Sequence, residues 1–186
     1  MPDNQNILKW RFDVNTFRLL GRELITDRIT AVYELVKNCY DANAKKVTVS
    51  FENVGKDAEG KAVITIEDDG HGMSFEDIRD KWMVVGTASK RTELFSPAPF
   101  NRRYVGEKGI GRFAVDKLGG RVRIITKQAG SDKRLVVVID WDEYERLSKE
   151  PQLELFTDVP NDFHWEKAPV EEQGTILEIS SIPEHE

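Results

Sequence analysis

Short apolar strands that come in pairs do most to limit the folds open to this chain. The alternating segment KVTVSFE (46–52) is followed, after a turn, by AVITIEDD (62–69). RVRIITK (121–127) and RLVVVIDW (134–141) repeat this arrangement around the turn AGSDK, and GTILEIS (174–180) predicts a last strand. Strands of this length with a turn between them are typical of β-hairpins. We therefore predict a mixed sheet that is mostly antiparallel.

Helices are predicted in the intervals between these strands, at 22–44, 74–85, 110–118 and 142–148. Thr26 and Asp27 are candidate N-cap residues of the first helix, and Ser74 is the candidate cap of the second. The stretch that follows the last helix is acidic and is predicted to be irregular. Helices interspersed with hairpins favour an α+β fold over a doubly wound parallel sheet. The prediction is a two-layer sandwich, with helices packed on one face of the sheet.

The composition is that of an ordinary globular protein, with 39% hydrophobic and 32% charged residues. Its 186 residues are enough for one domain with its own core, so we predict a single domain over residues 1–186. The formal charge of −6 opposes broad affinity for nucleic acids and membranes. Cys39 is the one cysteine, which favours a reducing compartment, and the sequence shows neither a signal peptide nor an apolar run of about 18–20 residues. The cytoplasm is therefore the predicted location.

Polar side chains line one side of the helix predicted at the N-terminal end. Glu34, Asn38 and Asp41 follow the spacing i, i+4, i+7, so they share a helix face. The apolar sector predicted opposite them comprises Ile25, Ile29, Val32, Val36 and Cys39. A solvated face is the ordinary explanation of such a set. Two features favour a binding site instead: all three are short acceptors with no lysine among them, and a second acceptor cluster follows.

That second cluster is EDDGHGM (67–73), in which Asp68 ends a strand that is predicted to be buried. Gly70 and Gly72 allow the backbone to turn sharply and to approach a ligand closely. A buried carboxylate is costly unless it meets a donor, and the exocyclic amine of a base would be one. An acidic turn after a strand explains the same residues equally well.

A glycine-rich segment, YVGEKGIGRFAV (104–115), is the third candidate feature. Gly106, Gly109 and Gly111 give the spacing GxxGxG, which is typical of neither the P-loop nor the dinucleotide-binding pattern. The preceding residues form a long segment rich in glycine, proline and basic residues, and such segments in compact domains are often functional. The spacing alone leaves the ligand of this segment undecided.

Three motifs in order resemble those of the GHKL ATPase superfamily, which comprises gyrase-type topoisomerases, the large heat-shock chaperone, histidine kinases and MutL. ELVKN with YDANA (34–44), DDGHGM (68–73) and GEKGIG (106–111) follow one another at intervals of just over thirty residues. The resemblance spans about 24–179, and WMVVGTASK (82–90) is most similar to the MORC branch and related bacterial, chaperone-like proteins. It implies the Bergerat nucleotide-binding fold, with ATP and Mg²⁺ as cofactors.

The resemblance also implies roles for individual residues. Glu34 would be the general base, positioning the attacking water, and Asn38 would be the sole protein ligand of Mg²⁺. Asp41 would shape the pocket or pair with a basic residue. Asp68 would accept a hydrogen bond from the adenine amine, and Thr175 would support the base. Met73 would pack either on adenine or in the core. Asp69 stands where the family usually has Asn, and it adds a negative charge near the pocket.

Residues of about 86–112 would form a lid over the phosphates. Backbone N–H groups of its glycines would meet the phosphates, and Lys108 is either a phosphate ligand or simply exposed. Lys90, Arg91, Arg102 and Arg103 make this segment basic, as ordinary surface charge or as a complement to ATP. The full nucleotide-site set is Glu34, Asn38, Asp41, Ala42, Lys45, Asp68, Gly70, Gly72, Met73, Gly86, Thr87, Ser89, Lys90, Gly106, Glu107, Lys108, Gly109, Ile110, Gly111, Arg112, Phe113 and Thr175.

Three functions stay open at this point. The first is a Mg²⁺-dependent ATPase of low turnover, in which nucleotide drives lid closure and homodimerisation. The second is an ATP-binding switch with negligible hydrolysis, and the third, less favoured, is a protein kinase domain. The family lysine that completes the phosphate site from a following domain is not in this sequence, so we expect either that the chain is the N-terminal domain of a longer protein or that another protein supplies the lysine. His71, His164 and His185 are not spaced as a metal site.

Overall fold

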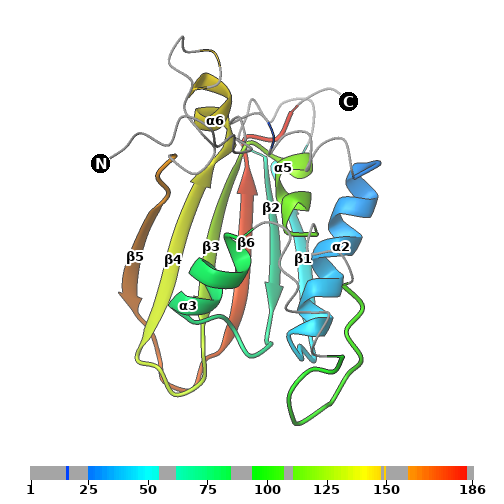
Figure 1. The fold of residues 1–186 in the computed structure, drawn as a ribbon, viewed down its shortest axis with the longest axis vertical. Helices are drawn as coiled ribbons and strands as arrows, with labels where there is room; N and C mark the ends of the chain where they lie inside the picture. The colour runs from blue at the N-terminus through cyan, green and yellow to red at the C-terminus, as the bar shows by residue number, and fades with distance from the viewer. Residues whose placement is uncertain are drawn as a thin grey trace, which may run out of the picture.

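A computed structural model describes residues 25–54, 62–84, 94–106, 111–147 and 159–183, together with the single residues 16 and 149. Six strands form one sheet in the order β1-β2-β6-β3-β4-β5 (Figure 1), and every pairing among the described strands is antiparallel. The strands are β1 (Val47–Glu52), β2 (Val63–Asp68), β3 (Arg121–Lys127), β4 (Lys133–Asp140), β5 (Asp162–Lys167) and β6 (Gly174–Ser180). The predicted, mostly antiparallel sheet and both of its hairpins are confirmed.

Helices cover one face of this sheet, which confirms the α+β two-layer prediction. The helical elements are α2 (Arg28–Asp41), α3 (Phe75–Asp77), the π-helix η2 (Ile78–Trp82), the 3-10 turn η3 (Gly111–Phe113), α5 (Ala114–Leu118) and α6 (Trp141–Leu147). In Figure 1, α2, α3 and α5 lie in front of the sheet, while α6 sits at the end of β4. Helix α2 packs against α5 and β2. Among the described residues, no helix has both the length and the apolar character needed to cross a membrane.

Strand β6, the last in the chain, lies in the middle of the sheet and joins the two hairpins. It pairs with β2 on one side and with β3 on the other. The buried residues Ile64, Ile124 and Ile179 share one face with the matching positions of their neighbours, and this face packs under the helices. Burying this continuous apolar layer gives the domain its core, since the free energy gained is roughly proportional to the area removed from water.

The buried face of α2 differs from the prediction. The stripe that packs on the sheet consists of Ala31, Leu35 and Cys39, at i, i+4 and i+8. Ile29, which was predicted to be in the apolar sector, is 83% exposed. Ala31 has no bulk beyond its Cβ, so this side of the helix can approach its neighbours closely, and Leu35 is buried beside it while Ile29 turns outward. The rotation also brings Glu34 and Asn38 beside the core instead of opposite it.

Element boundaries were predicted closely for the strands, whereas the first helix, predicted over 22–44, begins later and ends earlier, at Arg28–Asp41. Helix α2 begins after the cap Asp27, whose side chain accepts from the Thr30 amide at 2.7 Å, so Asp27 and not Thr26 is the N-cap. Ser74 and Asp77 form a reciprocal capping box at the start of α3, as the sequence predicted for Ser74. The prediction that the acidic stretch is irregular was wrong, because β5 lies within it.

Candidate functional site

The end of β2 places Asp68 in the middle of the sheet, directly across from Thr175 of β6. The Asp68 carboxylate accepts from the Gly70 amide at 2.8 Å, and the buried Cys39 thiol of α2 lies beside it. Burial raises the pKa of the Asp68 carboxyl above its ordinary value, although the Gly70 hydrogen bond opposes that rise. A carboxylate in this position is costly to keep charged, so an additional donor from a ligand would be favourable.

Asp69, the residue that departs from the family pattern, is used by the backbone. Its Oδ1 accepts from the amides of Lys45 and Lys46, at 2.6 and 2.9 Å. The hydrogen bond from the Lys46 amide is the main reason that the pKa of Asp69 is lowered. The Asp69 carboxylate therefore binds the connection between α2 and β1. Its two hydrogen bonds fix the backbone just before β1 begins.

The polar side of α2 carries an ion pair that the sequence analysis missed. The Lys37 Nζ atom lies 2.8 Å from Glu34 Oε1, and the two side chains are 20% and 29% exposed. The prediction that no lysine pairs with this acidic face was therefore wrong, because Lys37 pairs with Glu34, three residues earlier in the helix. Glu34 is nevertheless only partly solvated, and its second oxygen is turned toward the glycine segment.

Gly111 brings that glycine segment against the same two side chains of α2. A Cβ atom placed at Gly111 would lie 3.4 Å from Glu34 Oε2 and 3.6 Å from Asn38 Nδ2. The backbone at Gly111 is therefore close to both the carboxylate and the amide. Glu34 and Asn38 came from one motif and Gly111 from another, so two distant motifs meet here.

Asp41 holds the other end of the glycine segment. Its Oδ1 and Oδ2 atoms accept from the amides of Val105 and Gly106, at 2.9 and 3.1 Å. The side chain is buried, which strengthens these charge-assisted hydrogen bonds relative to bonds in water. Asp41 thus fixes the position at which the chain enters the glycine segment.

Residues 94–106, called the docked arm below, belong to the segment predicted as a lid, and they fold onto the C-terminal end of α2. The Ser96 hydroxyl donates to Asn43 Oδ1 at 2.6 Å, and Asn43 Nδ2 donates to the Pro97 carbonyl at 2.8 Å. Ser96 and Asn43 are both buried. This part of the segment is attached to the helix by buried polar contacts, so it is not a free loop.

Arg102 of the docked arm caps the end of α2. Its Nη1 donates to the Ala44 carbonyl at 2.7 Å, and its guanidinium lies 4.6 and 4.5 Å from the ring centroids of Tyr40 and Phe100. A cation at a helix C-terminus is favourable because carbonyl groups point toward it. Arg102 therefore has a structural contact that the basic-lid interpretation did not foresee.

Thr126 of β3 is a further polar residue that sequence reasoning did not single out. Its hydroxyl lies 3.0 Å from that of Thr175 and accepts from the Met73 amide at 2.8 Å. It thereby connects β3, β6 and the segment that follows Asp68. The only sequence signal was a threonine near the end of an apolar strand, which by itself indicates nothing about a site.

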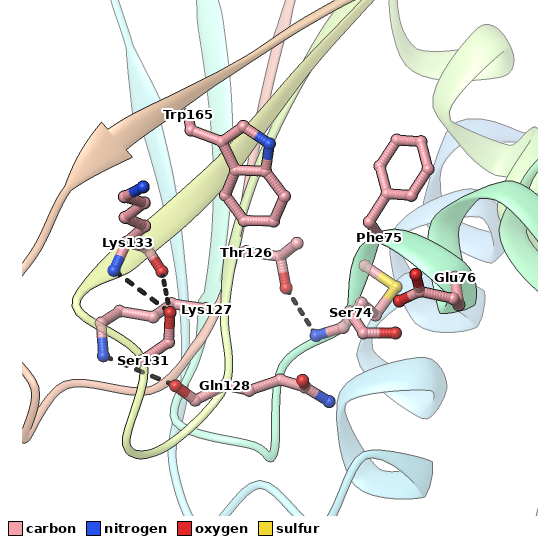
Figure 2. Close-up of a pocket in the computed structure, with 10 residues that line it drawn as sticks. Ser74, Phe75, Glu76, Thr126, Lys127, Gln128, Ser131, Lys133 and Trp165 are labelled. Carbon is pink, nitrogen blue, oxygen red and sulfur yellow. Dashed lines mark hydrogen bonds between the residues drawn. The ribbon is translucent and has the colours of Figure 1, made fainter.

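A cavity of about 270 Å³ is lined by residues 73–76 together with side chains from β3, β4 and β5 (Figure 2). Figure 2 shows Trp165 and Phe75 at its rim, with Thr126 between them and Lys133 on the neighbouring hairpin. Of the predicted site residues, Met73 alone lines it. Glu34, Asn38 and Asp68 do not line this cavity, so it is not the space beside α2.

The remaining predicted residues divide into three groups. Ala42 lies under the turn, where its carbonyl accepts from the His71 amide at 2.9 Å, whereas Phe113 is in the core. Lys45 is turned toward the docked arm, with its Nζ 5.9 Å from the Phe100 ring centroid. Outside the described residues lie Gly86, Thr87, Ser89, Lys90, Glu107, Lys108, Gly109 and Ile110, and the side chain of Arg112.

The described groups are chemically suited to a purine nucleotide and one hard cation. Asp68 and Thr175 offer a carboxylate and a hydroxyl to a base, and the backbone at Gly111 can face phosphate oxygens. Asn38 offers an amide oxygen, a ligand type that Mg²⁺ accepts. Within the described ranges, no three His, Cys, Asp or Glu side chains gather as a metal site.

Gly72 should be intolerant of any side chain. Its φ is +67°, and an added Cβ would overlap the carbonyl oxygen of Lys127. We expect Gly72→Ala to lower the free energy of unfolding by about 3 kcal/mol or more, since backbone strain and a clash with the backbone add. Gly130→Ala is the matched control, because its φ is +79° but an added Cβ meets nothing within 4 Å. Urea unfolding measures both; equal losses would show that the close approach at Gly72 is unimportant.

Comparisons with known proteins agree with this geometry. The family model described as "Histidine kinase-, DNA gyrase B-, and HSP90-like ATPase" matches residues 26–165. The DNA mismatch repair protein MutL of Dictyoglomus turgidum is 40% identical over 60 residues, covering 32% of this chain and 10% of MutL. The chaperone protein HtpG of Helicobacter hepaticus is 30% identical over 144 residues, covering 68% of this chain and 23% of HtpG. The chain thus spans less than a quarter of either relative.

A solved structure shares the fold. The crystal structure of the N-terminal domain of a DNA repair protein superposes with a TM-score of 0.52 at 18% identity, over 90% of this chain and 39% of that one. At this level of identity the likeness concerns the arrangement of helices and strands. It agrees with the α+β sandwich predicted from the two hairpins.

Proposed function

Because the chain belongs to the family of histidine kinase-, DNA gyrase B- and HSP90-like ATPases, we propose that it binds ATP with Mg²⁺ beside α2 and hydrolyses it slowly. One observation carries this proposal: groups from all three sequence motifs meet around a single helix. Glu34 and Asn38 lie against Gly111, and Asp41 holds Gly106. Cys39, on the next turn of the same helix, lies beside Asp68.

At the phosphate end, α2 would supply the reacting groups. Glu34 would orient water toward the terminal phosphate, and Asn38 would hold Mg²⁺, which would neutralise phosphate charge when bound. The backbone at Gly111 can come close to phosphate oxygens because no side chain stands in the way, whereas the Gly106 amide is held by Asp41 and fixes the start of the glycine segment. Alignment of this kind fits slow hydrolysis, since phosphoryl transfer depends mainly on positioning and on neutralisation of charge.

At the base end, β2 and β6 would recognise adenine. Asp68 accepts hydrogen bonds, so it suits the exocyclic amine of adenine and opposes the carbonyl oxygen of guanine. The raised pKa of Asp68 results from burial, and a buried acceptor discriminates strongly because an unpaired partner cannot turn to water. Thr175 lies in register with Asp68 on the neighbouring strand.

A second function, an ATP-binding switch with negligible hydrolysis, is favoured by the ion pair between Glu34 and Lys37. A carboxylate oxygen engaged by an ammonium at 2.8 Å is less available to a water molecule. In this alternative, nucleotide would close the segment around the docked arm and promote pairing of two copies. Multiple-turnover phosphate release at saturating Mg·ATP separates the two: a steady rate supports the ATPase, and none supports the switch.

Partners and assembly follow from the family only as proposals. We propose that the chain acts as one nucleotide-binding domain, as the N-terminal part of a longer protein or beside a protein that supplies a phosphate-binding lysine. Homodimerisation on ATP binding is the expected consequence. Sedimentation velocity with and without a non-hydrolysable ATP analogue tests it, and an unchanged sedimentation coefficient would reject dimerisation.

The decisive experiment is calorimetric titration of the chain with ATP in the presence of Mg²⁺ or of a chelator. We expect Asn38→Ala to weaken Mg·ATP binding by about 10- to 100-fold, the loss typical of a hydrogen bond or ligand contact to a charged group. Chelation of Mg²⁺ should weaken the wild type similarly but change the variant little. Gln128→Ala, which removes an exposed amide at the other cavity, is the control. Wild-type affinity of Asn38→Ala with Mg²⁺ would remove this residue from the metal site.

A further inference from the structure

Three polar side chains stand in one row across the centre of an otherwise apolar face. The register pairs Asp68 of β2 with Thr175 of β6, and Thr175 with Thr126 of β3. Thr126 is 1% exposed and Thr175 is also buried, so water is largely excluded from the pair. Buried hydroxyls form hydrogen bonds with fixed partners, and the direction of each bond has chemical consequences.

The contacts of Thr126 determine the direction of its hydrogen bond to Thr175. Thr126 Oγ1 already accepts from the Met73 amide at 2.8 Å. Its own proton has two possible acceptors, Thr175 Oγ1 at 3.0 Å and the Gly174 carbonyl at 3.4 Å. Hydrogen bonds between a hydroxyl and an oxygen are usually 2.5–3.0 Å long, so Thr175 is the better acceptor. The shorter distance favours Thr126 as the donor, and in that arrangement the proton of Thr175 is left for another partner.

We propose that Thr126 is a positioning residue for base selectivity: it makes Thr175 a hydrogen-bond donor to N1, the ring nitrogen beside the adenine amine on the edge that distinguishes adenine from guanine. This inference rests on the proposed ATP site. Asp68 and Thr175 then present an acceptor next to a donor. The edge of adenine offers the complementary pair, an amine donor beside a ring-nitrogen acceptor.

Guanine offers the opposite pattern to such a pair. Its carbonyl oxygen would face the Asp68 carboxylate, and its protonated N1 would face the Thr175 proton. Each mismatch leaves buried groups unpaired, and a site made of hydrogen-bonding groups rejects such ligands more strongly than an apolar pocket does. Without Thr126, the hydroxyl of Thr175 could rotate and accept instead, so part of the selectivity would be lost.

The test compares variants of Thr126 by equilibrium binding of ATP, GTP, 1-deaza-ATP and 7-deaza-ATP with Mg²⁺. In the wild type, 1-deaza-ATP should bind about tenfold more weakly than ATP, since it lacks the N1 acceptor. Thr126→Val should bind ATP, 1-deaza-ATP and 7-deaza-ATP with equal affinity. Its preference for ATP over GTP should be about tenfold smaller than that of the wild type. Thr126→Ser retains the hydroxyl and should keep the wild-type ratios.

Two further variants guard against a purely structural effect through the Met73 amide. In Thr126→Cys the thiol remains a weak acceptor for that amide but is a poor donor toward Thr175. This variant should therefore lose the selectivity for ATP over GTP even if Thr126→Val does not fold. Thr175→Val should abolish the same deaza effect, and the double variant Thr126→Val, Thr175→Val should add nothing to it. An equal loss for ATP and both analogues in the Thr126 variants would overturn the inference alone. Failure of the wild type to bind ATP would instead reject the proposed function.

Discussion

Glu34→Gln is expected to lower the steady-state rate of ATP hydrolysis about 10²- to 10⁴-fold while leaving Mg·ATP affinity within about threefold. Glutamine has nearly the same shape as glutamate, but it cannot take a proton from water and orients it less well. Asn38 and the backbone of Gly111 remain in place beside position 34, so the groups expected to bind Mg²⁺ and phosphate are unaffected. The loss should therefore fall on turnover and not on binding.

Phosphate release under multiple turnover, with calorimetry for affinity, measures this separation. Glu67→Gln is a matched control, because Glu67 is exposed on β2 and alternates with the residues that face the helices. Lys37 loses its ion-pair partner in Glu34→Gln, so Lys37→Gln distinguishes loss of the pair from loss of the carboxylate. If Glu34→Gln and Glu67→Gln hydrolyse ATP at the wild-type rate, Glu34 is not the base.

Asp68→Asn is expected to weaken ATP binding about 10- to 100-fold and to narrow or invert the preference for ATP over GTP. The new amide oxygen can keep the hydrogen bond from the Gly70 amide, which is 2.8 Å long in the wild type. Its NH₂ group would then point to the base, where it opposes the adenine amine but suits the guanine carbonyl. Selectivity should change in direction, which mere destabilisation of the fold would not produce.

Competition binding of ATP and GTP gives the ratio directly, and thermal unfolding reports the fold. Asp69→Asn is the matched control at the next position, since its amide oxygen can still accept from the amides of Lys45 and Lys46. It also restores the residue that the family usually has. Equal affinity of the wild type for ATP and GTP would contradict recognition of the base by Asp68.

Local signals made much of this fold predictable. The alternating strands and the cap residues Asp27 and Ser74 depend on neighbours in the sequence, and these were found where predicted. The motif residues were also predictable, because carboxylates, amides and glycines at fixed spacing have few ordinary roles together. What the sequence could not supply was the distance between motifs, which depends on how the sheet brings them together.

The wrong predictions share a physical cause, namely tertiary packing. Strand β5 is exposed over most of its length, so it lacks the alternation of buried and exposed residues that identifies a strand. The buried stripe of α2 was misplaced because the small side chain of Ala31 lets the helix approach closely, which outweighs the larger Ile29. Thr126 and Lys37 were missed because their partners lie on other strands or depend on side-chain conformation.

The attachment of the docked arm has a practical consequence, because one carboxylate holds two consecutive backbone protons. The amides of Val105 and Gly106 both donate to the buried Asp41. Such protons exchange with deuterium only when the segment leaves the helix, so with fast reclosing their exchange rate is the rate of a free amide multiplied by the population of the detached state. Deuterium uptake at these two positions thus measures local opening of the docked arm from α2, without a dye or a substitution.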